Sequence, residues 1–281
     1  MSKAIVGTDP GELTVAARRV LLSALDALKD QSSALVLVGA QAVYVRTESA
    51  ALTGIGYTSD ADLAIDPRQL VEEPLLEQAM CEAGFVYSGQ PGTWRLTQTI
   101  AGKDVDVMVD LMVPDKLMGA GTSRGGRIPP HGNTATRRSP GLEAAAFDHS
   151  PLRVGSLEPD QDPRVHTLNV AGPAALLIAK AFKIRDRLAD AERKPERLTD
   201  KDAGDVIRLM MTSGDISETF ERLEAEGRIA GVVREGQDLL INQFGSARSA
   251  GVDMAVRALA GDMPEERVRL LAPNYIDNYF N

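Results

Sequence analysis

A strictly alternating run, DVDVMVDLMV over residues 104–113, constrains the fold of this chain more than any other stretch. Successive side chains of a β-strand point to opposite faces, so the run predicts a strand with one apolar face and one acidic face. The acidic face carries Asp104, Asp106, Met108 and Asp110. Such a row of carboxylates is either a strand face open to solvent or one wall of a site, and the run alone does not choose between these interpretations.

The sequence around this strand predicts an α+β (α/β-like) fold, with helices flanking a mixed sheet. Apolar residues at helical spacing, short apolar runs, and a hairpin whose strands flank AGK support this assignment. The expected elements are helices at 12–29, 40–50 and 74–84 and strands at 34–39, 58–66, 94–100 and 104–113.

The composition of the chain changes after the predicted strand at 104–113. From Pro114 to about Asn169 the chain contains a stretch rich in Gly, Ser, Thr and Pro, which predicts loops, and beyond that region the pattern is helical. We therefore expect a sheet domain at 1–168, including a basic loop at 115–140, and a helical domain at 169–281.

Composition places the chain among acidic globular proteins. Of its 281 residues 43% are apolar, and the formal net charge is −9. This charge argues against a surface that coats nucleic acid broadly, although it allows a local basic patch. The single cysteine, Cys81, suits a reducing cytoplasm. We expect a cytoplasmic protein without membrane contact, because no apolar run approaches roughly 18 residues and the N-terminus lacks a signal-peptide pattern.

Two aspartates, Asp60 and Asp62, open the predicted strand TSDADLAID at 58–66. They lie two residues apart, so their side chains share a face and repel each other unless a cation lies between them. A metal ion, a basic side chain and simple solvation are the three candidate explanations.

The order of these features resembles the nucleotidyltransferase superfamily, which has the polymerase-beta-like fold. The family pattern is a Gly-Gly or Gly-Ser turn, a helix, a Dx[DE] pair on a strand, and a third Asp one or two strands later. The matching positions here are Gly39 and Ala40 for the turn, Asp60 and Asp62 for the pair, and Asp110, with Asp106 as the alternative, for the third acid.

The resemblance implies that Asp60, Asp62 and Asp110 bind Mg²⁺ or Mn²⁺, since hard cations prefer carboxylate and phosphate oxygens. It also implies that the backbone at the Gly39 turn approaches the triphosphate of a bound NTP. Ala40 departs from the pattern, because its side chain offers no hydroxyl to the nucleotide phosphates.

The later sequence resembles the AbiEii-type nucleotidyltransferases, a group that includes toxins of a bacterial toxin–antitoxin class. Their pattern is a Lys on an apolar helix, then Lys-Asp opening a second helix with another Asp three residues later. Lys180, Lys201, Asp202 and Asp205 match it, and the resemblance spans about residues 34–210. It implies that Lys180 contacts nucleotide phosphates and that Asp202 orients this lysine or the attacking hydroxyl.

Each of these roles has a plainer alternative. The pair Thr199 and Asp202 fits a capping box, in which Asp202 only starts a helix. Lys183, assigned to the nucleotide site, also fits a solvated helix face. Ser59 either begins the strand or contacts a phosphate. Five basic residues form either a solvated loop or a clamp for an RNA backbone: Lys116, Arg124, Arg127, Arg137 and Arg138. His131 in the same loop is expected to be a turn residue.

The leading hypothesis is a metal-dependent nucleotidyltransferase toxin that moves NMP from an NTP to an acceptor. By resemblance the acceptor is the tRNA 3′ end, so translation is blocked, and a cognate antitoxin protein is the partner. One alternative is a nucleotidyltransferase acting on small molecules such as aminoglycosides, which the excess of 40 acidic over 31 basic residues permits and the basic loop opposes. Another is a non-catalytic nucleotide-binding protein of the same fold.

Overall fold

The computed structural model describes residues 9–48, 57–119, 121, 123–195 and 198–280. The last two residues of the helix expected at 40–50 lie outside these ranges. Two compact units are present, the first formed by Met1–Gln41, Tyr57–Ser139 and His149–Ala171 and the second by Ala42–Gly56, Pro140–Asp148 and Gly172–Asn281. The chain therefore passes between the units several times, whereas the sequence predicts one boundary near residue 168.

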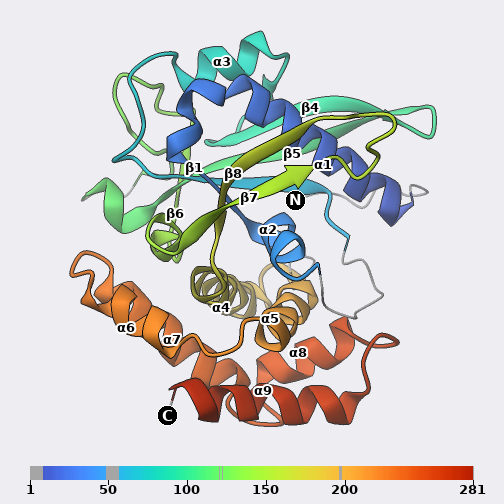
Figure 1. The fold of residues 1–281 in the computed structure, drawn as a ribbon, viewed down its shortest axis with the longest axis vertical. Helices are drawn as coiled ribbons and strands as arrows, with labels where there is room; N and C mark the ends of the chain where they lie inside the picture. The colour runs from blue at the N-terminus through green and yellow to red at the C-terminus, as the bar shows by residue number, and fades with distance from the viewer. Residues whose placement is uncertain (1–8, 49–56, 120, 122, 196–197, 281) are drawn as a thin grey trace. The chain divides into compact units, whose positions relative to one another are not determined.

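A mixed sheet forms the first unit, and its described strands follow the order β3-β4-β5-β2-β1-β8-β7, with β6 paired to β5 (Figure 1). The strand β2 is central, antiparallel to β1 and parallel to β5. The strands are β1 (Leu35–Val38), β2 (Asp60–Ile65), β3 (Val86–Tyr87), β4 (Thr93–Ile100), β5 (Lys103–Pro114), β6 (Arg137–Ser139), β7 (His149–Gly155) and β8 (Val165–Ala171).

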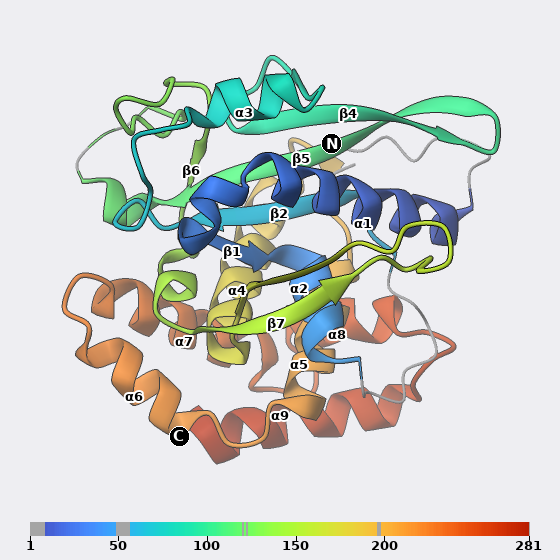
Figure 2. The same cartoon turned by 45° about the horizontal axis from the view of Figure 1, so that its top comes forward.

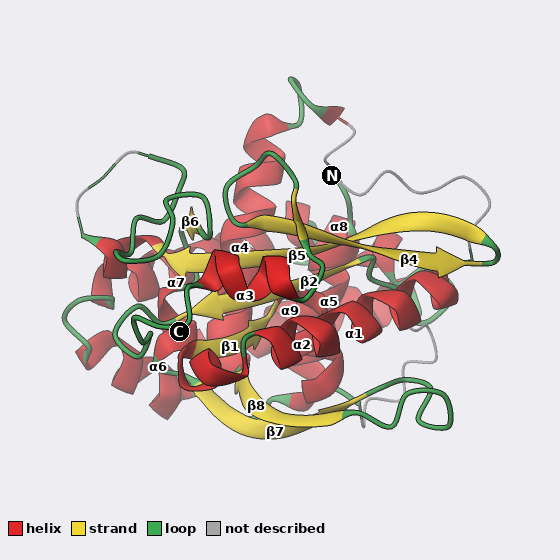
Figure 3. Ribbon diagram, turned by 90° about the horizontal axis from the view of Figure 1, so that it is seen from above, coloured by secondary structure: helices red, strands yellow, loops and turns green. Residues whose placement is uncertain are grey.

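Helix α1 (Pro10–Ala27) lies across one face of this sheet, beside α3 (Leu76–Glu82) (Figures 2 and 3). It begins where Asp9 caps its first turn by accepting a hydrogen bond from the Gly11 N–H at 2.7 Å. A 3₁₀ turn, η1 (Lys29–Ala34), leads from α1 into β1, and α2 (Gly39–Arg46) follows β1 directly. These elements agree with the expected helices and strands of the N-terminal part.

The apolar face of β5 supplies much of the core under α1. Val105, Val107, Val109 and Leu111 are all at most 3% exposed, as the alternation predicts. The hairpin turn is shorter than expected, because Lys103 pairs with Ile100 and belongs to the strand.

The region expected to form loops contains more structure than its composition indicates. It holds β6, β7, β8 and two 3₁₀ turns, η2 (Asp115–Met118) and η3 (Glu143–Ala146). Two of these strands, β7 and β8, pair along their full lengths, and β8 joins β1 in parallel. Only Val154 of β7 is buried, so the sequence of this strand carries a weak strand signal.

The second unit is helical, as expected for the C-terminal part. Its described helices are α4 (Pro173–Asp190), α5 (Lys201–Thr212), α6 (Ser217–Ala225), α7 (Ala230–Phe244), α8 (Ala250–Ala258) and α9 (Glu265–Phe280). Helix α4 packs against α5 and α7, while α9 contacts α5, α7 and α8. Among the described helices, none is both long enough and apolar enough to cross a lipid bilayer.

His131 is buried and structural, which refines the expectation of a turn residue. Its Nδ1 accepts a hydrogen bond from the Leu76 N–H at 3.2 Å, and its Nε2 donates to the Val71 carbonyl at 3.0 Å. The ring is 5% exposed. It thus ties the basic loop to the start of α3.

We expect His131→Phe to destabilise the protein by roughly 1–3 kcal/mol, because it leaves the buried Leu76 N–H without its partner, whereas the Val71 carbonyl keeps its hydrogen bond from Gln31 Nε2. Urea unfolding measures the loss. His149→Phe, at an exposed histidine of β7, serves as the control and should change the free energy of unfolding by less than about 0.5 kcal/mol. Equal losses in the two variants would contradict the role given to His131.

Candidate active site

The parallel pairing of β2 with β5 brings two of the predicted acids side by side. Asp62 is the register partner of Asp110, and Asp60 is the partner of Met108. Paired residues of neighbouring strands point to the same face, and so do residues two apart in one strand. Asp60, Asp62 and Asp110 therefore share the face opposite to the buried valines that lie under α1.

Gly39 lies directly against this carboxylate row. It has a φ of +69°, and a Cβ added to it would lie 2.1 Å from Oδ2 of Asp62. Only glycine fits this position, because both the backbone conformation and the contact exclude a side chain. Ala40 follows as a buried residue. Gly39 of the expected turn therefore contacts Asp62 of the expected Asp pair.

A short relay of polar groups fixes Asp60. Its Oδ1 accepts a hydrogen bond from the Thr58 hydroxyl at 2.8 Å, and its backbone carbonyl accepts one from Nε2 of Gln41 at 3.1 Å. Gln41 in turn accepts from Nε of Arg18 at 2.8 Å, and Arg18 is only 7% exposed. No motif in the sequence indicated Gln41 or Arg18. Ser59 lies between Thr58 and Asp60 and is half-buried.

Both oxygens of Asp110 have protein partners. The Thr93 hydroxyl donates to Oδ1 at 2.7 Å, and the Arg137 guanidinium donates to Oδ2 at 2.6 Å. Within the described residues, no three His, Cys, Asp or Glu side chains gather closely enough to hold a metal ion. Strand register aligns the three carboxylates on one face, and carboxylate oxygens are the donors that a hard cation prefers. In this structure, however, they do not converge on one point, and the oxygens of Asp60 and Asp110 contact hydroxyl and guanidinium groups instead.

Asp106, the alternative third acid, lies elsewhere on the same strand. The described part of β2 ends its pairing with β5 at Met108, two residues short of Asp106. Asp106 instead accepts hydrogen bonds from Thr97 and Arg95 on β4, at 2.8 and 2.7 Å. The Thr97 hydroxyl and then the Arg95 guanidinium lower the pKa of this carboxyl. The geometry therefore places Asp110, rather than Asp106, beside Asp62.

The basic loop uses part of its charge in contacts within the protein. Arg137 binds Asp110, and Arg138 donates to the Asp115 carboxylate at 2.6 Å and to the Gly119 carbonyl at 2.7 Å. Arg127 is exposed. Two of the five basic residues thus belong to the fold rather than to an open phosphate clamp.

Lys180, in the second unit, is buried between two acids. Its Nζ donates to Asp202 at 2.7 Å and to Asp205 at 2.6 Å, and the lysine is 3% exposed. Burial lowers the pKa of the Lys180 ammonium, but the two carboxylates outweigh burial and raise the pKa above its ordinary value. Arg187 also contacts Asp202, and the exposed Lys183 lies 3.7 Å from it.

These contacts determine the charge of Asp202 and the structural role of Lys180. Burial raises the pKa of Asp202, but the surrounding cations outweigh burial and hold it far below its usual range. The capping box is not formed, because Asp200 occupies the N-cap position and the Thr199 hydroxyl contacts Arg187. Lys180 therefore joins α4 to α5 as part of a buried ion cluster, and its ammonium already contacts two carboxylates.

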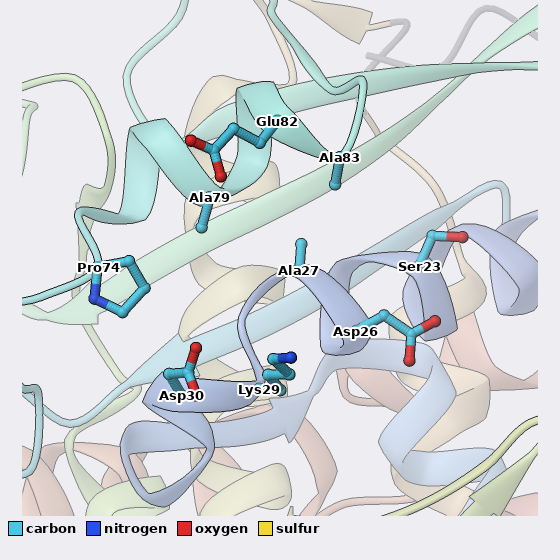
Figure 4. Close-up of a pocket in the computed structure, with 9 residues that line it drawn as sticks. All are labelled: Ser23, Asp26, Ala27, Lys29, Asp30, Pro74, Ala79, Glu82 and Ala83. Atoms are coloured by element: carbon cyan, nitrogen blue, oxygen red, sulfur yellow. The ribbon is translucent and has the colours of Figure 1, made fainter.

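A shallow cavity of about 590 Å³ lies between α1, η1 and α3 (Figure 4). Its lining includes Asp26, Asp30 and Glu82 but none of the predicted site residues. It belongs to the side of the sheet that α1 covers, whereas the aspartate row faces the opposite side. Asp26 is also paired with Arg164 at 3.0 Å. The cavity is thus separate from the carboxylate site.

Comparison of the chain with protein-family models, with curated proteins and with solved structures finds no match.

We expect Lys180→Met to destabilise the protein by about 3–5 kcal/mol, because it leaves buried carboxylates without their cation. Protonation relieves such carboxylates, so the deficit relative to wild type should shrink as the pH falls from 8 to 5. Wild type should instead lose stability as the pH falls below about 4, since the lowered pKa of Asp202 stabilises the fold only above the unfolded value.

Chemical denaturation at several pH values measures both effects. Lys183→Met is the matched control, because Lys183 is an exposed cation on the same helix. It should cost less than about 1 kcal/mol at any pH. A Lys180→Met variant as stable as Lys183→Met would contradict the buried ion cluster.

Proposed function

We propose that this protein is a metal-dependent nucleotidyltransferase that moves a nucleoside monophosphate from an NTP to a hydroxyl acceptor. The observation that carries the proposal is the register that sets Asp62 beside Asp110, with Asp60 on the same face. Gly39 lies against Asp62 at the start of α2, where backbone N–H groups can approach phosphate oxygens. A solvated strand face explains neither the buried supports of Asp60 nor this obligatory glycine.

The three carboxylates would hold Mg²⁺ or Mn²⁺, which, when bound, offsets charge on the triphosphate and the leaving group. In the transfer, the acceptor oxygen forms a bond to the α-phosphorus, the bond to the bridging oxygen breaks, and pyrophosphate leaves. The hydroxyl proton passes to a base, and Asp110 is the carboxylate proposed for this role. The Thr58 hydroxyl holds the Asp60 carboxylate in place, and Gln41 holds the Asp60 backbone.

The acceptor we propose is the 3′ end of tRNA, with a cognate antitoxin as protein partner, on the strength of the AbiEii resemblance. The exposed Arg127 and neighbouring Arg124 are available at the surface of the basic loop for an RNA backbone. The acidic cavity gives no support to a small cationic acceptor, because it lies on the other side of the sheet from Asp60 and Asp62.

Incubation with each labelled NTP, Mg²⁺ and total tRNA tests the proposal. We expect label on tRNA from at least one NTP, and a loss of more than about a hundredfold in Asp60→Asn and Asp62→Asn, since even groups that only support metal ligands contribute 10–100-fold. Asp106→Asn is the matched control and should stay within a few fold of wild type.

The other outcomes are equally informative. Label on an added aminoglycoside would support the small-molecule alternative. Absence of transfer and of pyrophosphate with every acceptor, or full activity in Asp62→Asn, would refute the proposed site.

We expect Gly39→Ala to abolish transfer, because the added Cβ would displace the Asp62 carboxylate. Gly102→Ala is the matched control, since Gly102 also has a positive φ of 76° but has open space around it. Both variants pay about 1–2 kcal/mol of backbone strain, which urea unfolding measures. Only Gly39→Ala should lose activity, and comparable activity in the two variants would contradict the close approach of Gly39 to Asp62.

A further inference from the structure

The Arg137–Asp110 ion pair offsets the charge repulsion that strand register creates between two aspartates. Asp62 and Asp110 are direct neighbours across two strands, so their negative charges repel each other. Arg137 Nη2 lies 2.6 Å from Asp110 Oδ2, and the two side chains are 23% and 20% exposed. The guanidinium thus supplies positive charge to the carboxylate that the proposed function assigns to a metal ion.

The backbone of Arg137 is fixed in place rather than carried by a free loop. Residue 137 opens β6, where it pairs with Met112 of β5 and forms a bridge to Gly125. Gly92, with a φ of +72°, lies so close that a Cβ on it would be 2.4 Å from the Arg137 backbone nitrogen. This packing holds the base of the side chain beside Asp110 while leaving the guanidinium partly open to solvent.

We propose that Arg137 is a built-in counter-ion that competes with the divalent cation for Asp110. In the metal-free protein Arg137 neutralises Asp110 and so reduces its repulsion of Asp62. When the cation binds, the guanidinium leaves Asp110 and pairs with a phosphate of the incoming NTP, for which its planar donors are suited. Arg137 is thus a counter-ion of Asp110 before the cation binds and a substrate contact afterwards, and the inference rests on the proposed function.

If Arg137 competes with the cation, replacing it should raise the affinity for Mn²⁺. A purely structural role for Arg137 predicts no such increase. Arg137→Gln should bind Mn²⁺ more tightly than wild type in the absence of nucleotide, by roughly tenfold, the size of one charge-assisted hydrogen bond. The same variant should need several times more NTP for half-maximal transfer, because the phosphate contact is lost. Loss of the EPR signal of free Mn²⁺ counts the bound ion directly, without using activity.

Arg95→Gln is the matched control. Arg95, on β4, forms an ion pair at 2.7 Å with Asp106, which lies on β5 as Asp110 does. Removing it should leave Mn²⁺ affinity within about twofold of wild type, because Asp106 lies outside the proposed set of ligands. Arg137→Lys keeps the charge and should remain near wild type, so it gives a second test if Arg137→Gln folds poorly.

The outcomes separate this inference from the proposed function. If Asp62→Asn abolishes Mn²⁺ binding but Arg137→Gln binds no better than wild type, Arg137 is not a competitor while the metal site stands. If Arg137→Lys instead gains affinity as a glutamine would, charge is not the cause and the inference is wrong. If neither wild type nor Arg137→Gln binds Mn²⁺ with or without NTP, the proposed function itself fails.

Discussion

The parallel pairing of β2 with β5 is the interaction on which the site depends. It sets Asp62 beside Asp110 on one face, while the alternate residues of both strands are buried under α1. A one-residue slip would turn every aspartate into the apolar layer. Burial of the apolar face therefore fixes the register, and the register fixes the positions of the carboxylates. The same strand pairing thus determines both the core packing and the proposed site.

Each unit contains neighbouring aspartates whose negative charge is offset by a basic side chain, but the exposure of the two clusters differs. In the helical unit, Lys180 contacts two aspartates and is 3% exposed, so the cluster is closed to outside ligands. In the sheet unit, Arg137 and Asp110 are each about a fifth exposed, and Asp110 holds a single cation. A site that exchanges its cation needs a partly exposed pair such as Arg137–Asp110. The buried Lys180 cluster is suited instead to joining two helices.

The local pattern predicted much of the fold but not the contacts that complete the site. Alternation in 104–113 correctly predicted a strand with Val107 inside and Asp110 outside, because burial of one face acts residue by residue. The partner of Asp110 could not be predicted in this way, since register with β2 joins residues nearly fifty positions apart. The strand β7 was missed because Pro151 and several exposed side chains weaken its pattern. Arg137 was noted only as one charge of a basic loop, and its contact with Asp110 depends on tertiary packing.

A crystal structure with Mn²⁺ and a non-hydrolysable NTP would test the central claim most directly, through the anomalous signal of manganese. We expect a peak among the carboxylates of Asp60, Asp62 and Asp110, with the triphosphate at the Gly39 turn and the Arg137 guanidinium moved off Asp110. A nucleotide bound elsewhere, or manganese absent from these carboxylates while Arg137 remains on Asp110, would contradict it.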